Sequence, residues 1–168
     1  KYLNPMDFQL LEMDTDSLYM ALTGKTLEDL IKPELRGDFE LQKHLWFPNT
    51  STPELKKYTR RTPGLFKVEA TGDEMDCLTS KSYYLAGKSK KWALKGVQER
   101  NNRELIWLER YKHALFSSAV LSATNRGFRM WDNQMQTYEM RKDGLSPIYD
   151  KRFLLDDGVT TIPLVSAD

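Results

Sequence analysis

The alternation of hydrophobic and polar positions near the start of the chain predicts a β-hairpin. Apolar runs at residues 8–13 and 18–22 flank the polar sequence Asp14-Thr15-Asp16-Ser17, a pattern typical of two antiparallel strands joined by a tight turn. The two carboxylates therefore lie at the bend. A short helix is expected next, between Thr26 as its N-cap and Pro33, which should end it.

The middle of the chain combines a proline-containing stretch with further strand patterns. Residues 39–63 hold prolines among Asn, Ser and Thr, so we expect an irregular insertion there. Residues 65–70 and 75–85, placed around a Gly72-Asp73 turn, predict a second hairpin. Residues 92–97 predict a third strand that follows this hairpin.

Strand periodicity gives the second hairpin a chemical character. With a period of two, Lys81 and Tyr83 share one face of the strand, with Cys77 and Thr79 behind them. The pattern therefore predicts a cationic and aromatic ledge. The simpler alternatives are a solvated strand lysine and a cross-strand packing tyrosine.

The last third of the chain predicts one long helix followed by a small antiparallel sheet. Residues 104–123 carry apolar side chains three or four positions apart, and Asn125-Arg126-Gly127 should stop this helix through a left-handed C-cap. Asp143-Gly144 and Asp157-Gly158 are turn signals between strand-like runs. The expected fold class is α+β with strands dominant, divided near residues 86–96.

The amino-acid composition limits the classes of protein to which the chain can belong. The chain has 168 residues, 40% of them hydrophobic and 29% charged, which suits one ordinary folded domain or two small ones. One cysteine, Cys77, excludes an internal disulfide framework, and two histidines make a His-built metal centre improbable, so any metal here needs carboxylates. Neither a transmembrane run nor a signal peptide is legible, so we expect an intracellular protein without a membrane role.

The net charge of +1 conceals basic segments. No acidic residue occurs between Cys77 and Gln98, and a second basic cluster occupies residues 56–61. Both segments are compatible with phosphate binding or with ordinary solvated loops. The cations of the first segment are Lys81, Lys88, Lys90, Lys91 and Lys95.

The carboxylate pair at the first turn is the strongest chemical signal. Two like charges this close raise each other's pKa unless a cation lies between them. Mg²⁺ prefers oxygen ligands and commonly uses one or two carboxylates together with substrate phosphates, so Asp14 and Asp16 suit a metal–nucleotide site. The alternative is that Asp and Ser simply favour turns.

Three enzyme classes use such a pair, and the flanking residues separate them. An aspartyl-phosphate phosphatase would have Thr or Val four residues after the first Asp, where this chain has Leu18. A sugar-nucleotide transferase would usually show a nucleotide-binding α/β domain before the pair. A polymerase palm places the pair on a β-hairpin, as residues 10–22 predict.

The sequence Asp14-Thr15-Asp16-Ser17 resembles motif C of family B DNA polymerases. Ser80-Lys81-Ser82-Tyr83 resembles the Lys-x-Tyr motif that follows motif C in this family, and residues 63–69 resemble the strand before that motif in protein-primed members. Lys95-Gly96-Val97 resembles the step into the thumb. The resemblance covers residue 8 to about 164 and points to protein-primed polymerases of viral or virus-derived transposon type.

The resemblance implies a fold and a set of roles. Residues 1–96 would be the C-terminal part of the palm, with the insertion near 39–63, and residues 97–168 a thumb-like α+β subdomain. Asp16 and Asp14 would be catalytic and bind Mg²⁺, with Mn²⁺ as a substitute. The implied DNA-binding residues are Lys81, Tyr83 and Lys95, with backbone contacts from Lys88, Lys90, Lys91, Arg126 and Arg129.

The implied partners are primer-template DNA, deoxynucleoside triphosphates, a terminal protein primer and the rest of a polymerase chain. The chain begins at Lys1 without a methionine, and motifs A and B are not found in it, so we expect a fragment that does not polymerise DNA by itself. The alternative is a domesticated remnant that serves as a DNA-binding or protein-interaction module. The compartment stays open, with the nucleus of an infected or host cell among the candidates.

Overall fold

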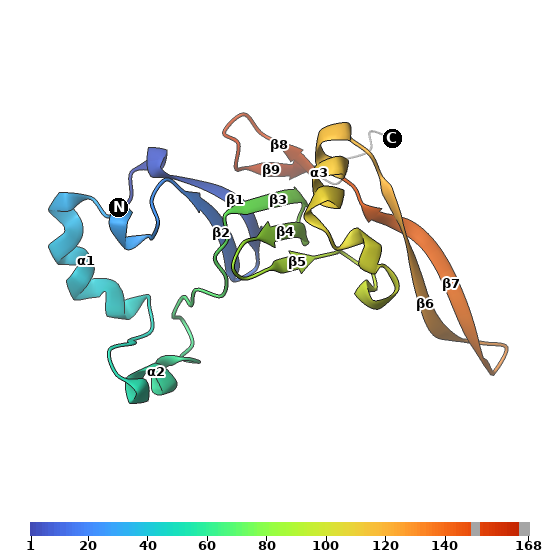
Figure 1. The fold of residues 1–168 in the computed structure, drawn as a ribbon, viewed down its shortest axis with the longest axis horizontal. Coiled ribbons are helices and arrows are strands. Elements are labelled where there is room, and N and C mark those ends of the chain that lie inside the picture. The colour runs from blue at the N-terminus through green and yellow to red at the C-terminus, as the bar shows by residue number, and fades with distance from the viewer. Residues whose placement is uncertain (149–151, 165–168) are drawn as a thin grey trace. The chain divides into compact units, whose positions relative to one another are not determined.

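The computed structural model describes residues 1–148 and 152–164, and within them helices alternate with antiparallel sheets. This confirms the α+β class. The chain divides into two compact units, residues 1–71 and 72–168, and Figure 1 shows the elements of each. Short 3-10 helices connect the longer elements at Pro5–Asp7, Glu28–Leu30, Pro33–Leu35, Lys43–Leu45, Glu99–Asn101 and Arg103–Leu105.

The first unit contains the hairpin that the sequence predicted. Strand β1 (Phe8–Asp14) pairs antiparallel with β2 (Ser17–Leu22), and a bulge lies between Leu10 and Glu12. The last pair joins Asp14 to Ser17, so the connection is a two-residue turn. The hairpin prediction is confirmed, including the position of its acidic tip.

The helices of the first unit are short. The helix expected after Thr26 is a single 3-10 turn, Glu28–Leu30, and its N-cap is Leu27 rather than Thr26. The Thr26 Oγ1 accepts a hydrogen bond from the Asp29 N–H at 3.2 Å, and the Asp29 carboxylate accepts one from the Thr26 N–H at 3.0 Å. Pro33 begins the next 3-10 turn, Pro33–Leu35. Beyond it lie α1 (Arg36–Gln42) and α2 (Pro53–Thr59). The Tyr2 ring packs against α1, with its centroid 5.4 Å from the Phe39 ring and 5.4 Å from the Trp46 ring.

The expectation of an irregular insertion at 39–63 is therefore wrong in part. Helix α2 begins there because Thr52 is its N-cap, accepting from the Leu55 N–H at 3.2 Å, and because Pro53 occupies the first helical position, where no N–H is needed. The residues between α1 and α2 remain a 3-10 turn and loop.

The second unit begins with a three-stranded antiparallel sheet in the order β3-β4-β5. Its strands are β3 (Glu74–Thr79), β4 (Ser82–Ala86) and β5 (Lys91–Ala93). The second hairpin thus turns at Ser80-Lys81 rather than at Gly72-Asp73, and residues 65–70 are not a strand. Residues 65–70 alternate in polarity but pair with none of the described strands, and Phe66 and Val68 are therefore largely exposed.

Helix α3 (Leu108–Ser117) packs against β3 and β4. The expected helix over 104–123 is too long at both ends: a 3-10 turn precedes α3, and Ser118 adopts a left-handed conformation (φ 54°) that ends it. The buried core of the unit is made of Tyr84, Leu94, Leu105, Tyr111, Ala114, Ala123 and Leu145. This core joins residues on both sides of position 96, whereas the sequence placed a division there.

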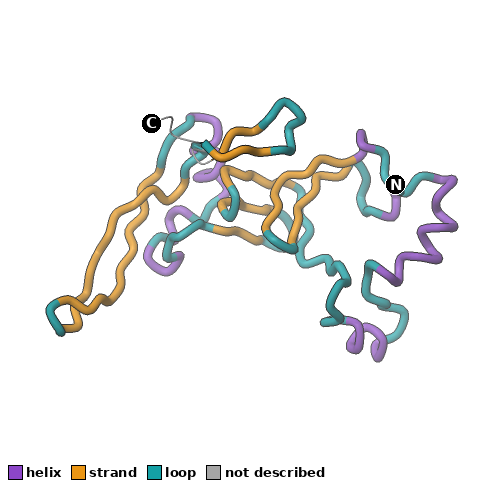
Figure 2. Tube along the Cα trace, turned by 180° about the vertical axis from the view of Figure 1, so that it is seen from behind, coloured by secondary structure: helices purple, strands orange, loops and turns teal. Residues whose placement is uncertain are grey.

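A long two-stranded ribbon extends from this core, as Figures 1 and 2 show. It consists of β6 (Leu121–Trp131) and β7 (Gln134–Leu145), joined by Asp132-Asn133, which both have positive φ as a primed turn requires. We call it the β6–β7 ribbon. A shorter hairpin, β8 (Arg152–Leu154) with β9 (Thr161–Pro163), follows and turns at Asp157-Gly158 as expected.

Two expected turns lie inside the β6–β7 ribbon instead. Asn125-Arg126-Gly127 does not end a helix, because the Asn125 side chain donates to the Gly96 carbonyl (2.8 Å) and accepts from the Gln98 N–H (2.9 Å). Asp143-Gly144 is not a turn either. A Cβ at Gly144 would lie 2.7 Å from the Ala123 Cβ, so the glycine serves close packing.

Candidate functional site

The aspartate turn, residues 14–17, is fixed by its own strands and by local hydrogen bonds. Asp14 ends β1 and is half-buried, whereas Asp16 lies in the two-residue turn and is exposed. The Thr15 hydroxyl donates to the Asp14 carboxylate (3.2 Å), and the Ser17 hydroxyl donates to the Asp14 carbonyl (3.1 Å). The structure therefore brings both carboxylates to one tight turn, where only Thr15 separates the two aspartates.

Thr15 is an unusual choice for its place in this turn. Its φ of 56° lies in the left-handed region, where a β-branched residue is sterically disfavoured and Gly or Asn is the ordinary occupant. Such a conformation costs about 1–3 kcal/mol and persists where the surroundings fix it, often at functional sites.

The aspartate turn supplies only part of the ligands that a magnesium site needs. Within the described residues, no three His, Cys, Asp or Glu side chains come together to hold a metal ion. Mg²⁺ needs six oxygen ligands and commonly takes one or two from carboxylates and the rest from waters and substrate phosphates. Asp14 and Asp16 match the number of carboxylate ligands that such a site takes from the protein.

Lys81 and Tyr83 are arranged differently from the predicted ledge. Lys81 lies in the turn between β3 and β4 with a left-handed φ of 63° and is exposed, whereas Tyr83 lies within β4 and is only 9% exposed. They do not share a strand face, because the strand predicted at 75–85 breaks at Ser80-Lys81. Cys77 pairs directly with Tyr83, so it lies on the same face as Tyr83 rather than behind it.

The remaining lysines of the basic segment lie along the β4–β5 connection and just beyond it. Lys88 and Lys90 are exposed in the connection, Lys91 begins β5 and is half-buried, and Lys95 is exposed next to Gly96. The Lys142 ammonium from β7 approaches Gly96, where an added Cβ would lie 2.7 Å from it. Lys95 and Lys142 therefore concentrate positive charge where the chain leaves β5.

Arg126 and Arg129 both lie on the β6–β7 ribbon but on opposite faces, since they are three residues apart in one strand. Arg126 forms an exposed ion pair with Glu139 on β7 at 2.8 Å. The Arg129 guanidinium lies 5.7 Å from the centroid of the Trp131 ring. The expectation that both arise from a helix-ending turn is corrected by their place in β6, and the two cannot point together at one surface.

Comparison with protein-family models, with curated proteins and with solved structures found no match. Among residues 1–148 and 152–164, no helix has the length and apolar character that crossing a bilayer requires.

Sequence reasoning missed two residues that shape the surface of the second unit. Asn102 is only 1% exposed, and its side chain makes three hydrogen bonds. Trp107 is 57% exposed although tryptophan is a large apolar side chain. Asn102 follows Asn101 between two arginines, Arg100 and Arg103, so its polar neighbours give no sign that it is buried. No local pattern distinguishes an exposed tryptophan from a buried one.

Proposed function

We propose that this chain is part of a DNA-directed DNA polymerase of family B, to which it contributes the two carboxylates of motif C and part of the primer-template grip. The observation that carries the proposal is the Asp14-Thr15-Asp16-Ser17 sequence placed on the tight turn of an antiparallel hairpin. In the proposed reaction, a primer 3′-hydroxyl attacks the α-phosphate of a deoxynucleoside triphosphate and pyrophosphate leaves.

The aspartate turn is suited to hold divalent cations against a triphosphate. Asp16 is exposed and extends beyond the paired strands, and the Asp14 backbone carbonyl and carboxylate are held by Ser17 and Thr15. Bound Mg²⁺, or Mn²⁺ in its place, would neutralise charge that develops on the phosphates. The two-residue turn fixes the backbone of both aspartates and the Thr15 hydroxyl orients the Asp14 carboxylate, so less ordering is needed when substrate arrives.

The proposed DNA grip rests on cations of the second unit that are exposed, except for the half-buried Lys91. Lys81 would contact the phosphate backbone as a point charge, with Lys88, Lys90, Lys91 and Lys95 along the same segment. Arg126 and Arg129 would add contacts from either face of the β6–β7 ribbon. Tyr83 is largely enclosed, so its proposed share is support for the strand that follows Lys81.

Two measurements on the 168-residue chain test this function. Paramagnetic broadening of amide signals by Mn²⁺ with dTTP should centre on residues 14–17 and disappear in the Asp14→Asn/Asp16→Asn variant. Binding of labelled primer-template duplex should weaken with salt and weaken further in Lys81→Ala, but not in Lys25→Ala, an exposed lysine of the first unit. Uniform broadening, or equal behaviour of the two lysine variants, would count against the assignment.

A second candidate is a polymerase remnant that serves as an interaction module. The observation in its favour is the exposed apolar end of the β6–β7 ribbon, since large exposed apolar side chains often mark contact surfaces. Retained duplex binding without the metal response at residues 14–17 would favour this candidate. The exposed side chains are Phe128, Met130, Trp131 and Met135.

A further inference from the structure

An open hollow of about 520 Å³ lies on the surface of the second unit. Its lining combines two indole rings with two guanidinium groups and only one carboxylate. We call it the Trp–Arg hollow. Its lining residues are Trp92, Glu99, Arg100, Arg103, Ile106 and Trp107.

One aromatic wall of the Trp–Arg hollow is anchored to the core. The Trp92 ring stacks on Tyr84, with centroids 6.2 Å apart and an interplanar angle of 18°. Tyr84 in turn contacts the fully buried Tyr111, whose hydroxyl donates to the Ala93 carbonyl at 2.9 Å. The Trp92 ring is thus fixed from behind, while 36% of the residue stays exposed.

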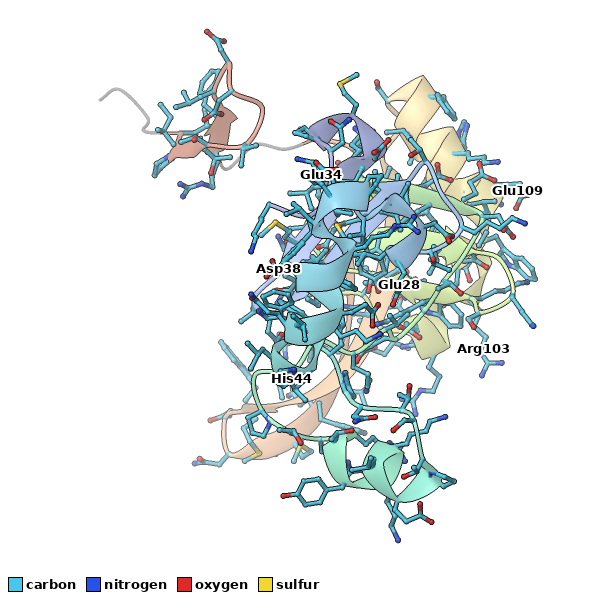
Figure 3. The ribbon with its side chains drawn as sticks, turned by 90° about the vertical axis from the view of Figure 1, so that its left-hand side faces the viewer. Glu28, Glu34, Asp38, His44, Arg103 and Glu109 are labelled. Carbon is cyan, nitrogen blue, oxygen red and sulfur yellow. The ribbon has the colours of Figure 1, made fainter. Side chains whose placement is uncertain are left out.

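The two arginines are carried by a loop that is equally fixed. Asn102 lies between them, and its side-chain amide pairs with both backbone groups of Thr124 on β6: its Nδ2 donates to the Thr124 carbonyl (2.8 Å) and its Oδ1 accepts from the Thr124 N–H (2.7 Å). The same Nδ2 also donates to the Gln98 carbonyl. The backbone that carries Arg100 and Arg103 is therefore held firmly in place. Figure 3 shows the Arg103 side chain extending outward from this backbone.

The chemistry of the Trp–Arg hollow selects a ligand with flat rings and negative charge. Trp107 is 57% exposed, so its ring is available for stacking. Indole rings stack on any nucleobase, and guanidinium groups contact phosphates or stack on bases themselves. A base pair buried inside a duplex offers no free face to a ring, so the fit is to unpaired bases.

We propose that the Trp–Arg hollow binds single-stranded nucleic acid, with bases on Trp92 and Trp107 and the phosphate backbone on Arg100 and Arg103. Aromatic grooves also bind proline-rich peptides, but two arginines against one glutamate give this groove a charge that suits an anion. The inference is independent of the proposed polymerase function, because it requires neither the aspartate turn nor a divalent cation.

The test measures anisotropy of fluorescein-labelled (dT)12 with the full 168-residue chain, in EDTA and over a salt series. Trp107→Ala should weaken binding at least about fivefold at every salt concentration, since loss of a stacking ring acts on one base. Trp107→Phe, which keeps a ring, should restore most of the affinity. The matched control is Phe116→Ala, an exposed aromatic residue (79%) on α3 outside the hollow, which should change affinity less than twofold.

The proposed phosphate contacts of the two arginines are tested separately, through the salt dependence of binding. Arg100→Ala/Arg103→Ala should lower the slope of log K against log salt by about 1.4, because each phosphate contact on a single strand contributes about 0.7. Equal losses of affinity in Trp107→Ala and Phe116→Ala would overturn the proposal, as would an unchanged salt slope in the double arginine variant. Competition by dTMP or by a proline-rich peptide as strong as that by unlabelled (dT)12 would overturn it too. Because EDTA removes divalent cations, a failed metal test at residues 14–17 would leave this result standing.

Discussion

Replacing Asn102 by alanine should strongly destabilise the second unit, because this side chain anchors the loop that carries Arg100 and Arg103. The Asn102 side chain is almost fully buried and acts as a substitute strand partner for Thr124 on β6. Alanine at this position would leave three backbone groups without their partners: the Thr124 N–H, the Thr124 carbonyl and the Gln98 carbonyl.

The magnitude follows from the number of bonds lost. A buried backbone group left without a partner costs about 1–3 kcal/mol, so three such groups predict a loss of about 3 kcal/mol or more in the free energy of unfolding. For a unit of this size, each kcal/mol lowers the melting temperature by roughly 4–8 °C. The expected fall in melting temperature is therefore roughly 12–24 °C.

Urea and thermal unfolding, followed by far-ultraviolet circular dichroism, measure this loss. The matched control is Asn101→Ala, because the Asn101 side chain makes one hydrogen bond, to the Gln98 side chain at 2.8 Å on the surface. That variant should lose less than about 1 kcal/mol. Equal stability losses in the two variants, or a loss below about 1 kcal/mol in Asn102→Ala, would refute the anchoring role.

Two further predictions concern packing and pH. Gly144→Ala should lower the free energy of unfolding in urea by about 1–3 kcal/mol, because the new Cβ would lie 2.7 Å from the Ala123 Cβ. Gly37→Ala should raise it by about 0.5–1 kcal/mol, because Gly37 lies on α1 with open space around it. A Gly144→Ala variant more stable than Gly37→Ala would contradict this packing. Burial, aided by the Glu74 charge and opposed by Lys112, raises the pKa of Asp76 above its ordinary 3.8. Folded protein then holds this proton more tightly than unfolded protein, so stability should fall as pH rises from about 4 through the folded pKa. Asp76→Asn should remove that fall, and an unchanged pH profile would contradict it.

Local signals predicted the elements in which neighbouring residues decide the conformation. The hairpin around residues 14–17 and the Asp157-Gly158 turn both follow from turn residues between apolar runs. The Asp132-Asn133 turn carries a comparable signal, since Asp and Asn tolerate positive φ. The sequence interpretation did not use this signal and placed turns at Asn125-Arg126-Gly127 and Asp143-Gly144 instead.

The remaining errors arise where distant residues decide the outcome. Asn125 is held in β6 by Gly96 and Gln98, almost thirty positions earlier, and Gly144 is required by Ala123 and Leu105. The Trp–Arg hollow gathers residues from β5 and the loop before α3. None of these contacts leaves a periodic trace in the sequence, whereas the aspartate turn is wholly local and was found.

The most direct test of the polymerase proposal is template-directed primer extension by the product of the reading frame extended upstream of Lys1. Asp16→Asn should reduce the rate at least about a hundredfold, since metal-ion stabilisation of phosphoryl transfer is worth several kcal/mol, with duplex binding retained. The matched control is Asp132→Asn, an exposed aspartate in the turn of the β6–β7 ribbon, which should extend primers like the parent. The polymerase proposal would be contradicted if the Asp16→Asn variant extended primers at the unsubstituted rate. It would also be contradicted if the unsubstituted extended protein never extended a primer.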